Sequence, residues 1–257
     1  MRAMDNVLLA RSKACPAGQS FIDHIFTGFV ELHGDRRFGD DRAIIGGLAY
    51  LGDIPVTVIA SEKGGDAKDR ASRNFGSAHP EGYRKALRLM KQAEKFRRPV
   101  ICLINTSGAF CGIGAEERGQ GQAIAENLME MTALQTPIIS ILTGEGGSGG
   151  ALALAVANEV WMLERSVYSV ISPEGCASIL YRDAKQAELA AENLKLTADH
   201  LYHLGVIDAI VSDENYEDTY RQLRRKLLAT LPKYTAMTPS ALAEHRRLRF
   251  RAIGANF

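Results

Sequence analysis

A glycine-rich segment is the strongest chemical signal in this chain of 257 residues. It reads Gly144-Glu-Gly-Gly-Ser-Gly-Gly150 and separates an apolar run, typical of a strand, from residues 151–157, whose small side chains predict a helix. Glycine allows sharp turns and leaves amide N–H groups uncovered, and a helix start adds donors without partners. We therefore expect a site for an anion, either a phosphate or a transient oxyanion. A tight turn with close helix–sheet packing is the purely structural interpretation.

A second glycine-rich loop has the same relation to its neighbours. Thr106-Ser-Gly-Ala-Phe-Cys-Gly-Ile-Gly114 follows an apolar run that ends at Asn105, and it leads into a helical pattern. Two such loops should lie on the same edge of a parallel sheet, where sites form in α/β proteins. Glu116 and Glu117 in the second loop are explained equally well by a catalytic role or by favourable charge at a helix start.

Ser148 lies in a Gly-x-Ser-x-Gly pattern, which is the signature of a hydrolase nucleophile. Such an enzyme also needs an acid and a histidine later in the chain. The available residues are Asp183, Asp208, His200, His203 and His245. No Gly-x-x-x-x-Gly-Lys motif for ATP occurs, and a Gly-x-Gly-x-x-Gly pattern at residues 144–149 lacks the acidic residue that dinucleotide sites require.

Positive charge is concentrated between residues 63 and 98. This segment holds eleven basic and four acidic residues, a balance of 11 − 4 = +7 within a chain whose net charge is only +1. Arg88, Lys91 and Lys95 fit a solvated helix face. Lys63, Arg70 and Arg73 sit in a glycine-containing loop, and they could equally attract a phosphorylated substrate or an acidic carrier protein.

The elements that must position these residues alternate between strands and helices. Strands are expected at residues 44–50, 55–60, 99–105, 137–143, 159–163, 167–171 and 206–211, and helices at 82–96, 115–134, 186–194, 198–204, 218–231 and 240–249. This order predicts an α/β fold with a mostly parallel sheet. We expect one domain over residues 1–257, with a helical lead-in over residues 1–40 and a helical C-terminal tail over residues 216–257.

Composition excludes several classes of protein. Apolar residues make up 46% of the chain and charged residues 24%, which is ordinary for a globular protein. The near-zero net charge argues against nucleic-acid binding, and no apolar run is long enough for a membrane helix. The four cysteines are too widely spaced for a zinc site or a disulfide framework. We expect a cytoplasmic protein without a metal.

Five motifs together resemble the α subunit family of bacterial acetyl-CoA carboxylase carboxyltransferases. They are Arg73-Asn-Phe-Gly76, Pro80-Glu-Gly-Tyr-Arg-Lys-Ala-Leu-Arg-Leu-Met90, Gly114-Ala-Glu-Glu-Arg-Gly-Gln120, the segment from Gly144 to Ala153, and Tyr168-Ser-Val-Ile-Ser-Pro-Glu-Gly-Cys-Ala-Ser-Ile-Leu180. The resemblance implies a crotonase-like fold, a spiral of ββα units. It also implies transfer of a carboxyl group from carboxybiotin to acetyl-CoA, which gives malonyl-CoA for fatty-acid synthesis.

The resemblance also implies partners and site residues. The family works with a β subunit, usually as an α2β2 assembly, and a separate biotin carboxyl carrier protein supplies carboxybiotin in trans. We expect the backbone amides of Gly149, Gly150 and Ala151 to form an oxyanion hole on the biotin side. Gly146 and Gly147 should support the turn, and Gly108 and Ala109 should line the opposite wall. Val in place of Gly150 should abolish transfer and leave folding largely intact.

The chain departs from the family pattern in places. Ser107, Phe110 and Cys111 stand where relatives commonly have proline, tyrosine and proline, and Ala60-Ser-Glu-Lys-Gly64 replaces Gly-His-Gln-Lys-Gly. The long helical extension found at the N-terminus of many relatives is also missing. Two other functions stay open at this point. One is a serine hydrolase that uses Ser148, and the other is a non-catalytic scaffold for a β subunit.

Overall fold

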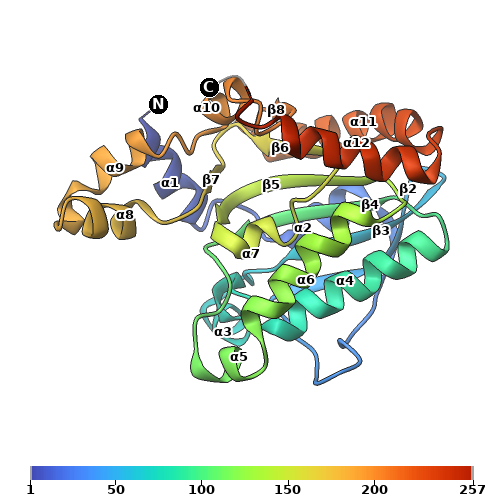
Figure 1. Cartoon of the computed structure of the whole chain (residues 1–257), viewed down its shortest axis with the longest axis horizontal. Coiled ribbons are helices and arrows are strands. Elements are labelled where there is room, and N and C mark those ends of the chain that lie inside the picture. Colours follow the sequence, from blue (N-terminus) through green and yellow to red (C-terminus); the bar gives the residue numbers. More distant parts are fainter. Residues whose placement is uncertain (1, 256–257) are drawn as a thin grey trace.

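The computed structural model describes residues 2–255, so the outer ends of the expected domain, residues 1 and 256–257, lie outside the described residues. One eight-stranded sheet forms the centre of the molecule (Figure 1). Its strand order is β1-β2-β3-β4-β5-β6-β8, and β7 pairs with β5 beyond the end of β6. The strands are β1 (Thr27–Glu31), β2 (Ile44–Leu51), β3 (Ile54–Ser61), β4 (Val100–Thr106), β5 (Ile138–Gly147), β6 (Glu159–Leu163), β7 (Val167–Ser169) and β8 (Ala209–Val211).

The sheet is antiparallel at one side and parallel elsewhere. β1, β2 and β3 form an antiparallel meander, whereas all pairings from β3 through β4, β5 and β6 to β8 are parallel. Every residue of β4 and nearly every residue of β5 is buried, because helices cover both faces of these central strands. The parallel arrangement brings the carboxyl ends of β4 and β5 to the same edge.

Helices cover both faces of the sheet, and some of them project beyond one end of it. They are α1 (Ala3–Arg11), α2 (Gly18–Ile25), α3 (Ala67–Ser72), η1 (Asn74–Gly76), α4 (Pro80–Lys95), α5 (Ile113–Glu117), α6 (Gln120–Ala133), α7 (Ser148–Leu152), α8 (Pro173–Leu180), η2 (Ala184–Gln186), α9 (Ala187–Asn193), α10 (Ala198–His203), α11 (Tyr216–Thr235) and α12 (Pro239–Ala252).

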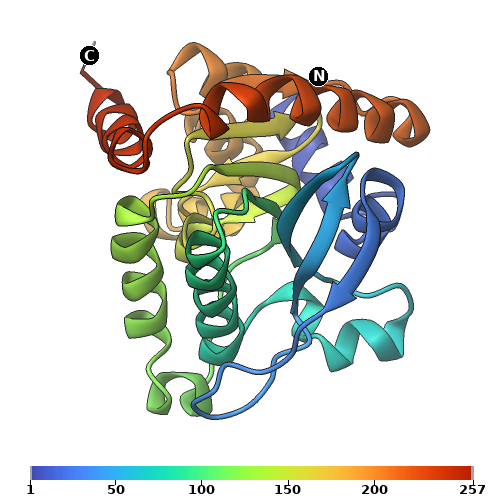
Figure 2. The ribbon, with the colours of Figure 1, turned by 90° about the vertical axis from the view of Figure 1, so that its right-hand side faces the viewer.

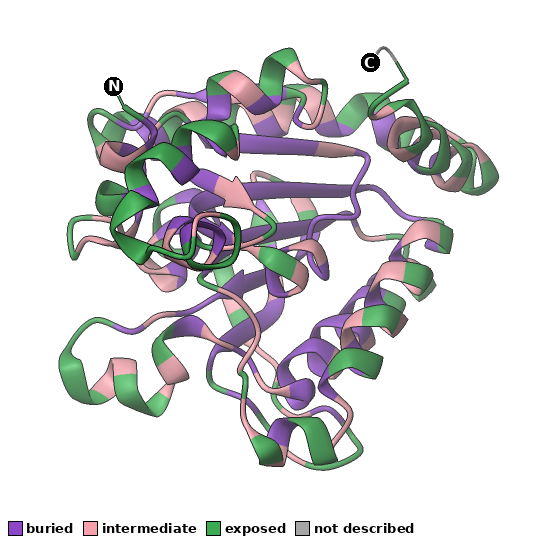
Figure 3. Cartoon of the chain, turned by 60° about the vertical axis from the view of Figure 1, so that its left-hand side comes forward, coloured by how far each residue is buried: buried purple, intermediate pink, exposed green. Residues whose placement is uncertain are grey.

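Each face of the sheet has its own apolar core. On one face, α4 and α6 pack against alternate residues of β4, among them Cys102 and Ile104. On the other face, α2 and α11 pack against the intervening residues Ile101 and Leu103. This alternation follows from the two-residue period of a strand. Figure 2 shows α4 and α6 side by side on one face, and Figure 3 shows buried strands beneath helices with exposed outer surfaces.

A smaller unit lies at the carboxyl-end side of the parallel strands. Helices α1, α8 and α9 project beyond the sheet there, on the left of Figure 1. Val7 of α1 packs with Ala191 of α9 and Val167 of β7, and Cys176 of α8 packs with Ala190. The N-terminal helix therefore lies beside a segment more than 150 residues away in the chain. We call α1, α8 and α9 the helical arm.

Several elements differ from the sequence expectations. The expected helical lead-in contains strand β1, whose residues alternate in exposure at the edge of the sheet. The expected helix over residues 115–134 is divided into α5 and α6, because Gly119 adopts a left-handed conformation with φ = 80°. The helix expected over residues 151–157 instead begins at Ser148 and ends at Leu152, since β5 continues through most of the glycine segment.

Candidate active site

The two glycine-rich loops meet at the carboxyl ends of β4 and β5, as the sequence predicts. A Cβ atom placed on Gly150 would lie 2.5 Å from the amide nitrogen of Ala109 and 2.7 Å from the hydroxyl oxygen of Tyr83. A Cβ atom on Gly147 would clash with the carbonyl oxygen of Ser107. Both positions therefore require glycine, because the backbones of the two loops pass too close for a side chain.

Gly149 has different surroundings from the other glycines of this segment. A Cβ atom there would meet only Ile124, at an ordinary distance of 3.5 Å. Gly149 and Gly150 stand in the first turn of α7, where backbone amides have no acceptor within the helix, and no side chain caps this turn. Gly149 is half-exposed, whereas Gly150 and Ala151 are buried. Of the three amides expected to form an oxyanion hole, the one at Gly149 thus lies nearest to the surface.

Ser148 lies at the turn between β5 and α7 and has a positive φ. Its φ of 51° lies in the left-handed region, which is unfavourable for a residue with a side chain, and its side chain is exposed. Such a geometry at a functional turn resembles the strained turn of a hydrolase nucleophile. However, the histidines that a hydrolase would need are engaged elsewhere. His200 contacts the hydroxyl of Thr197, and His203 contacts the carbonyl oxygen of Asp199.

The third candidate histidine is also removed from the turn. His245 lies beside Asn158 and Tyr234, where α12 packs against the start of β6. Within residues 2–255, no hydrogen bond joins the Ser148 hydroxyl to a histidine or to a carboxylate. A serine hydrolase therefore lacks its general base in this structure.

Two pockets open on either side of Ser148. One has a volume of about 270 Å³ and is lined by Arg11, Ser107, Gly146 and Gly147, together with residues 169–173. The other has a volume of about 330 Å³ and a mainly apolar lining that includes Gly149, Leu152 and Tyr168. Ser148, Ser169 and Val170 line both pockets. The turn at residues 148–149 therefore forms a ridge between a polar pocket and an apolar one.

A chain of charged groups supports the end of β5 beside the polar pocket. Glu145 accepts a hydrogen bond from Nε of Arg11 at 2.8 Å and lies 3.5 Å from Nζ of Lys63. Arg11 also contacts Glu174 of α8 at 2.7 Å. Burial lowers the pKa of Lys63, although Glu145 acts to raise it. Arg11 therefore connects α1 with both β5 and α8.

The side chain of Asn105, near the end of β4, contacts residues 144 and 145 of β5. Its side-chain oxygen accepts a hydrogen bond from the amide of Glu145 at 3.0 Å, and its side-chain nitrogen points to the sulfur of Cys15 at 3.4 Å. A Cβ atom on Gly144 would lie 2.6 Å from the same Asn105 oxygen. The buried amide of Asn105 thus explains a third glycine of the segment.

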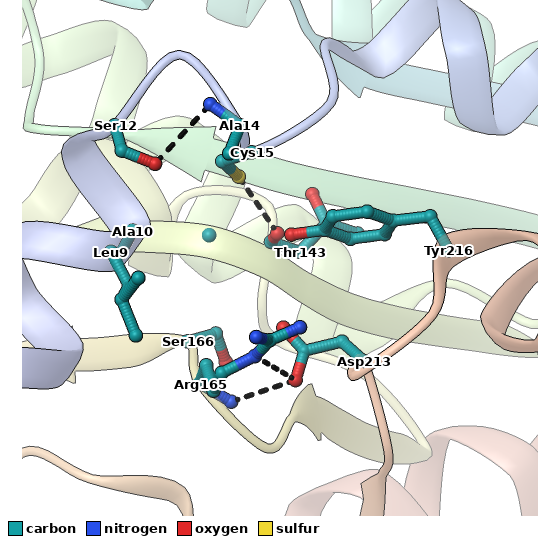
Figure 4. A pocket seen from close by; sticks show the side chains of 11 residues that line it. Leu9, Ala10, Ser12, Ala14, Cys15, Thr143, Arg165, Ser166, Asp213 and Tyr216 are labelled. Atoms are coloured by element: carbon teal, nitrogen blue, oxygen red, sulfur yellow. Dashed lines mark hydrogen bonds and ion pairs between the residues drawn. The ribbon is translucent and has the colours of Figure 1, made fainter.

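Cys15 lies in a separate, small pocket behind this strand (Figure 4). Its thiol contacts the carbonyl oxygen of Thr143 at 3.3 Å, and Arg165 and Asp213 pair at 3.1 Å on the far side. Burial raises the pKa of the thiol. With a volume of about 50 Å³, this pocket has room for water rather than for a substrate.

Of the three predicted basic residues, the structure joins only Lys63 to the glycine segment, and it engages Arg73 elsewhere. Lys63 pairs with Glu145, as described above. Arg73 pairs with Asp69 at 2.8 Å and donates a hydrogen bond to the carbonyl oxygen of Arg42. Arg70 is half-buried and forms no ion pair within the described residues. A phosphate or carrier contact at these three positions stays a prediction.

Sequence reasoning missed three residues of the site. Arg11, Tyr83 and Asn105 each contact the glycine segment from an element distant in sequence. Tyr83 belongs to a motif that carries the family resemblance, and Asn105 directly precedes the second loop, so both offered a signal. Arg11 offered none, because only the folded chain brings α1 to β5.

Residues 2–255 contain neither a metal-binding cluster nor a membrane-spanning helix. No group of three or more histidine, cysteine, aspartate or glutamate side chains there could hold a metal ion. None of the helices in that range combines the length and the apolar character needed to cross a membrane.

Solved structures with this fold define its class. A chain of transcarboxylase 12S superimposes with a TM-score of 0.72 at 17% identity, over 87% of this chain and 43% of that one. A chain of a Pseudomonas malonate decarboxylase hetero-tetramer, solved in complex with coenzyme A, also gives a TM-score of 0.72, at 20% identity over 94% of both chains. The fold is therefore crotonase-like, as the family resemblance implies.

Sequence relatives identify the family. Residues 1–254 match the family described as acetyl co-enzyme A carboxylase carboxyltransferase-like, and this chain belongs to it. It is 60% identical to the acetyl-coenzyme A carboxylase carboxyl transferase subunit alpha of Ruminiclostridium cellulolyticum, over 99% of this chain and 98% of that protein. It is 54% identical to a protein of Natranaerobius thermophilus named as subunits beta/alpha, of which it spans 42%.

Proposed function

We propose that this chain is the α subunit of an acetyl-CoA carboxylase carboxyltransferase. Together with a β subunit, it would transfer the carboxyl group from carboxybiotin to acetyl-CoA and give malonyl-CoA. The observation that carries this proposal is the first-turn amide of Gly149 beside the apolar pocket, in a chain that belongs to this family. Membership of the family suggests the reaction, and the turn at residues 148–149 is where we propose that it takes place.

The reaction needs stabilised oxyanions more than it needs a protein nucleophile. Loss of the carboxyl group leaves negative charge on the ureido oxygen of biotin, and deprotonation of acetyl-CoA leaves an enolate. Preorganised N–H donors stabilise such charges, and one well-placed donor contributes about 3 kcal/mol to the transition state. The biotin-derived base can take the methyl proton itself, so that the absence of a histidine at Ser148 is no obstacle.

Among the proposed donors, Gly149 has the leading role. Its amide lies at the edge of the apolar pocket, whereas Gly150 and Ala151 are buried behind it and would act through the helix turn that they form. In this proposal Gly147 would support the turn against the second loop, where Gly108 and Ala109 would form the facing wall, and Gly146 would support it beside Leu142 and Tyr168. The half-buried Arg70 is the remaining candidate for a phosphate or carrier contact.

A second subunit is part of the proposal. The relative from Natranaerobius carries β and α in one chain, and the malonate decarboxylase with this fold is a hetero-tetramer. We propose an α2β2 assembly that receives carboxybiotin from a biotin carboxyl carrier protein in trans. The other reading, a scaffold without a catalytic role, would leave the reaction to the β subunit alone.

The test is the reverse reaction in a reconstituted pair. The chain is co-purified with a candidate β subunit, and malonyl-CoA-dependent carboxylation of free biotin is measured for the pair and for each subunit alone. We expect turnover only from the pair. Equal turnover by the β subunit alone would reduce this chain to a scaffold, and failure of a stable pair to react would contradict the proposal.

A further inference from the structure

A groove between the β1–β2 loop and helix α4 is lined by four arginines and a lysine, together with Leu87 and the carboxylates of Asp35 and Glu126. It has a volume of about 340 Å³, and its lining includes Arg36, Arg37, Arg84, Arg88 and Lys91. The loop passes beneath α4 and away from the glycine turn (Figure 1). Neither the family match nor the proposed reaction gives this groove a role.

Three of the five basic side chains have an acidic partner. Arg84 pairs with Asp35 at 2.7 Å, Arg37 with Glu126 at 3.5 Å and Lys91 with Glu130 at 3.0 Å. Within residues 2–255, Arg36 and Arg88 form no ion pair. Both guanidinium groups instead point to the carbonyl oxygen of His33, at 2.8 Å for Arg36 and 3.3 Å for Arg88.

Two like charges therefore share one neutral acceptor. Arg88 also donates to the carbonyl oxygen of Gly34 at 3.0 Å. Burial lowers the pKa of Arg88 and the charge of Arg36 lowers it further, whereas the charges of Asp40 and Asp35 act to raise it. Guanidinium groups bind phosphate through parallel hydrogen bonds, and an anion between these two would relieve their repulsion.

The loop that presents Arg36 is held rigidly in place. One oxygen of Asp35 accepts hydrogen bonds from the amides of Arg37, Phe38 and Gly39, at 2.8–3.0 Å. Burial acts to raise the pKa of Asp35, but these amides and Arg84 outweigh it and lower the pKa to about 2. Asp35 therefore stays charged and keeps the loop ordered.

Arg36 itself adopts a strained backbone conformation. Its φ of 67° lies in the left-handed region, which is unfavourable for a residue with a side chain. Strain of this kind persists only where the surrounding structure enforces it, and it gathers at ligand sites. Here it folds the Arg36 side chain back beside Arg88.

We propose that Arg36 and Arg88 form a binding site for a phosphate group. The groove has room for a phosphate ester larger than inorganic phosphate. The chemistry is shared by free phosphate and by the phosphates of coenzyme A, and the experiment separates these sources. The site stands whether or not the chain is a carboxyltransferase subunit.

Calorimetric titration of the full chain with inorganic phosphate tests the site. Arg36→Gly removes one guanidinium and places glycine where φ is positive, so that the fold is not put at risk. Arg88→Gln removes the other. Each change should weaken phosphate binding about tenfold, which corresponds to the loss of one charged contact. Arg225→Gln, an exposed arginine on α11, is the matched control and should change the affinity less than about twofold.

Coenzyme A and dephospho-coenzyme A identify the source of the phosphate. A preference for coenzyme A that disappears in Arg36→Gly assigns the site to the 3′-phosphate, whereas equal binding of both, with phosphate still bound, assigns it to another phosphate compound. The proposal is overturned if the wild-type chain binds no phosphate. It is equally overturned if the two site variants bind as the wild type does, or if Arg225→Gln loses as much affinity as they do.

Discussion

The glycines of residues 144–150 fall into two groups: most are required by close packing, and one is free to take part in chemistry. Gly144, Gly146, Gly147 and Gly150 each face an atom that leaves no room for a Cβ, whereas Gly149 does not. The purely structural interpretation of the motif thus accounts for four of its five glycines. Only Gly149 combines free space and partial exposure with a place in the first turn of α7, so the proposed function depends most on this residue.

Gly150→Val is therefore not the clean test that the sequence indicates. The new side chain would collide with Ala109 and Tyr83, and overpacking of this kind costs about 1–3 kcal/mol. We expect the variant to lose activity and also to unfold at a temperature several degrees lower. Thermal unfolding followed by circular dichroism measures this. An unchanged unfolding temperature would show that the two loops are farther apart than described.

Ser148→Gly separates the hydroxyl group from the turn that carries it. Because φ at this position is 51°, glycine should remove strain and raise the free energy of unfolding by up to about 1 kcal/mol. The rate of biotin carboxylation in the reconstituted pair should stay within about threefold, since the proposed oxyanion donors are backbone amides that this substitution leaves in place. A loss of activity greater than tenfold would reveal a role for the Ser148 hydroxyl.

At the scale of elements, the periodic spacing of apolar residues along the sequence predicts most of the helices and strands. The helix expected at residues 82–96 is α4, because its apolar residues Leu87 and Met90 form one face. The strands that precede both glycine loops were also predicted, and their common edge followed from the parallel sheet. Strand β1 was missed because an edge strand with exposed residues lacks a long apolar run.

The charged support of the site could not be predicted in the same way. Arg11 and Glu145 are 134 residues apart, and neither residue has a local pattern that indicates its partner. The packing of α1 against α9 and β7 places Arg11 there. Sequence periodicity reports what an element buries, but it does not report which distant element covers it.

Arg11→Met tests whether this contact holds the helical arm against β5. The variant leaves Glu145 and Glu174 without their shared cation, so that α1 and residues 167–174 should open more readily. We expect faster hydrogen–deuterium exchange in these segments and unchanged exchange in β4 and α4. Arg247→Met removes an exposed pair with Glu244 on α12 and should leave the arm unchanged. Equal exchange in both variants would contradict a structural role for Arg11.

The whole molecule depends on carboxylates that pair in the native state. The pKa values of Asp35 and Asp40 are both lowered to about 2, against burial, by amides and by Arg84 and Lys85. The native state therefore binds fewer protons than the unfolded state between about pH 4 and pH 2, and stability must fall as the pH falls through this range. Above pH 4 this contribution is fully present.

Urea denaturation from pH 5 to pH 2.5 measures this dependence. The free energy of unfolding of the wild type should decrease steadily over that range. Asp35→Asn, which cannot titrate, should be less stable at pH 5 and should show a shallower decrease. A slope in the variant equal to that of the wild type would mean that Asp35 does not contribute.

One measurement tests the role of the open amide most directly. Proline in place of Gly149 deletes that N–H, and the first turn of a helix tolerates proline. We would combine it with Ser148→Gly, which relaxes the residue before the proline, and compare the double variant with Ser148→Gly alone. Both are assayed with the β subunit for malonyl-CoA-dependent carboxylation of biotin.

We predict that kcat of the double variant falls by a factor of about 10²–10³, the usual effect of removing one oxyanion donor, while its unfolding temperature and its binding to the β subunit match those of Ser148→Gly. A double variant that folds, pairs and retains kcat within about threefold would show that the Gly149 amide does not stabilise the transition state.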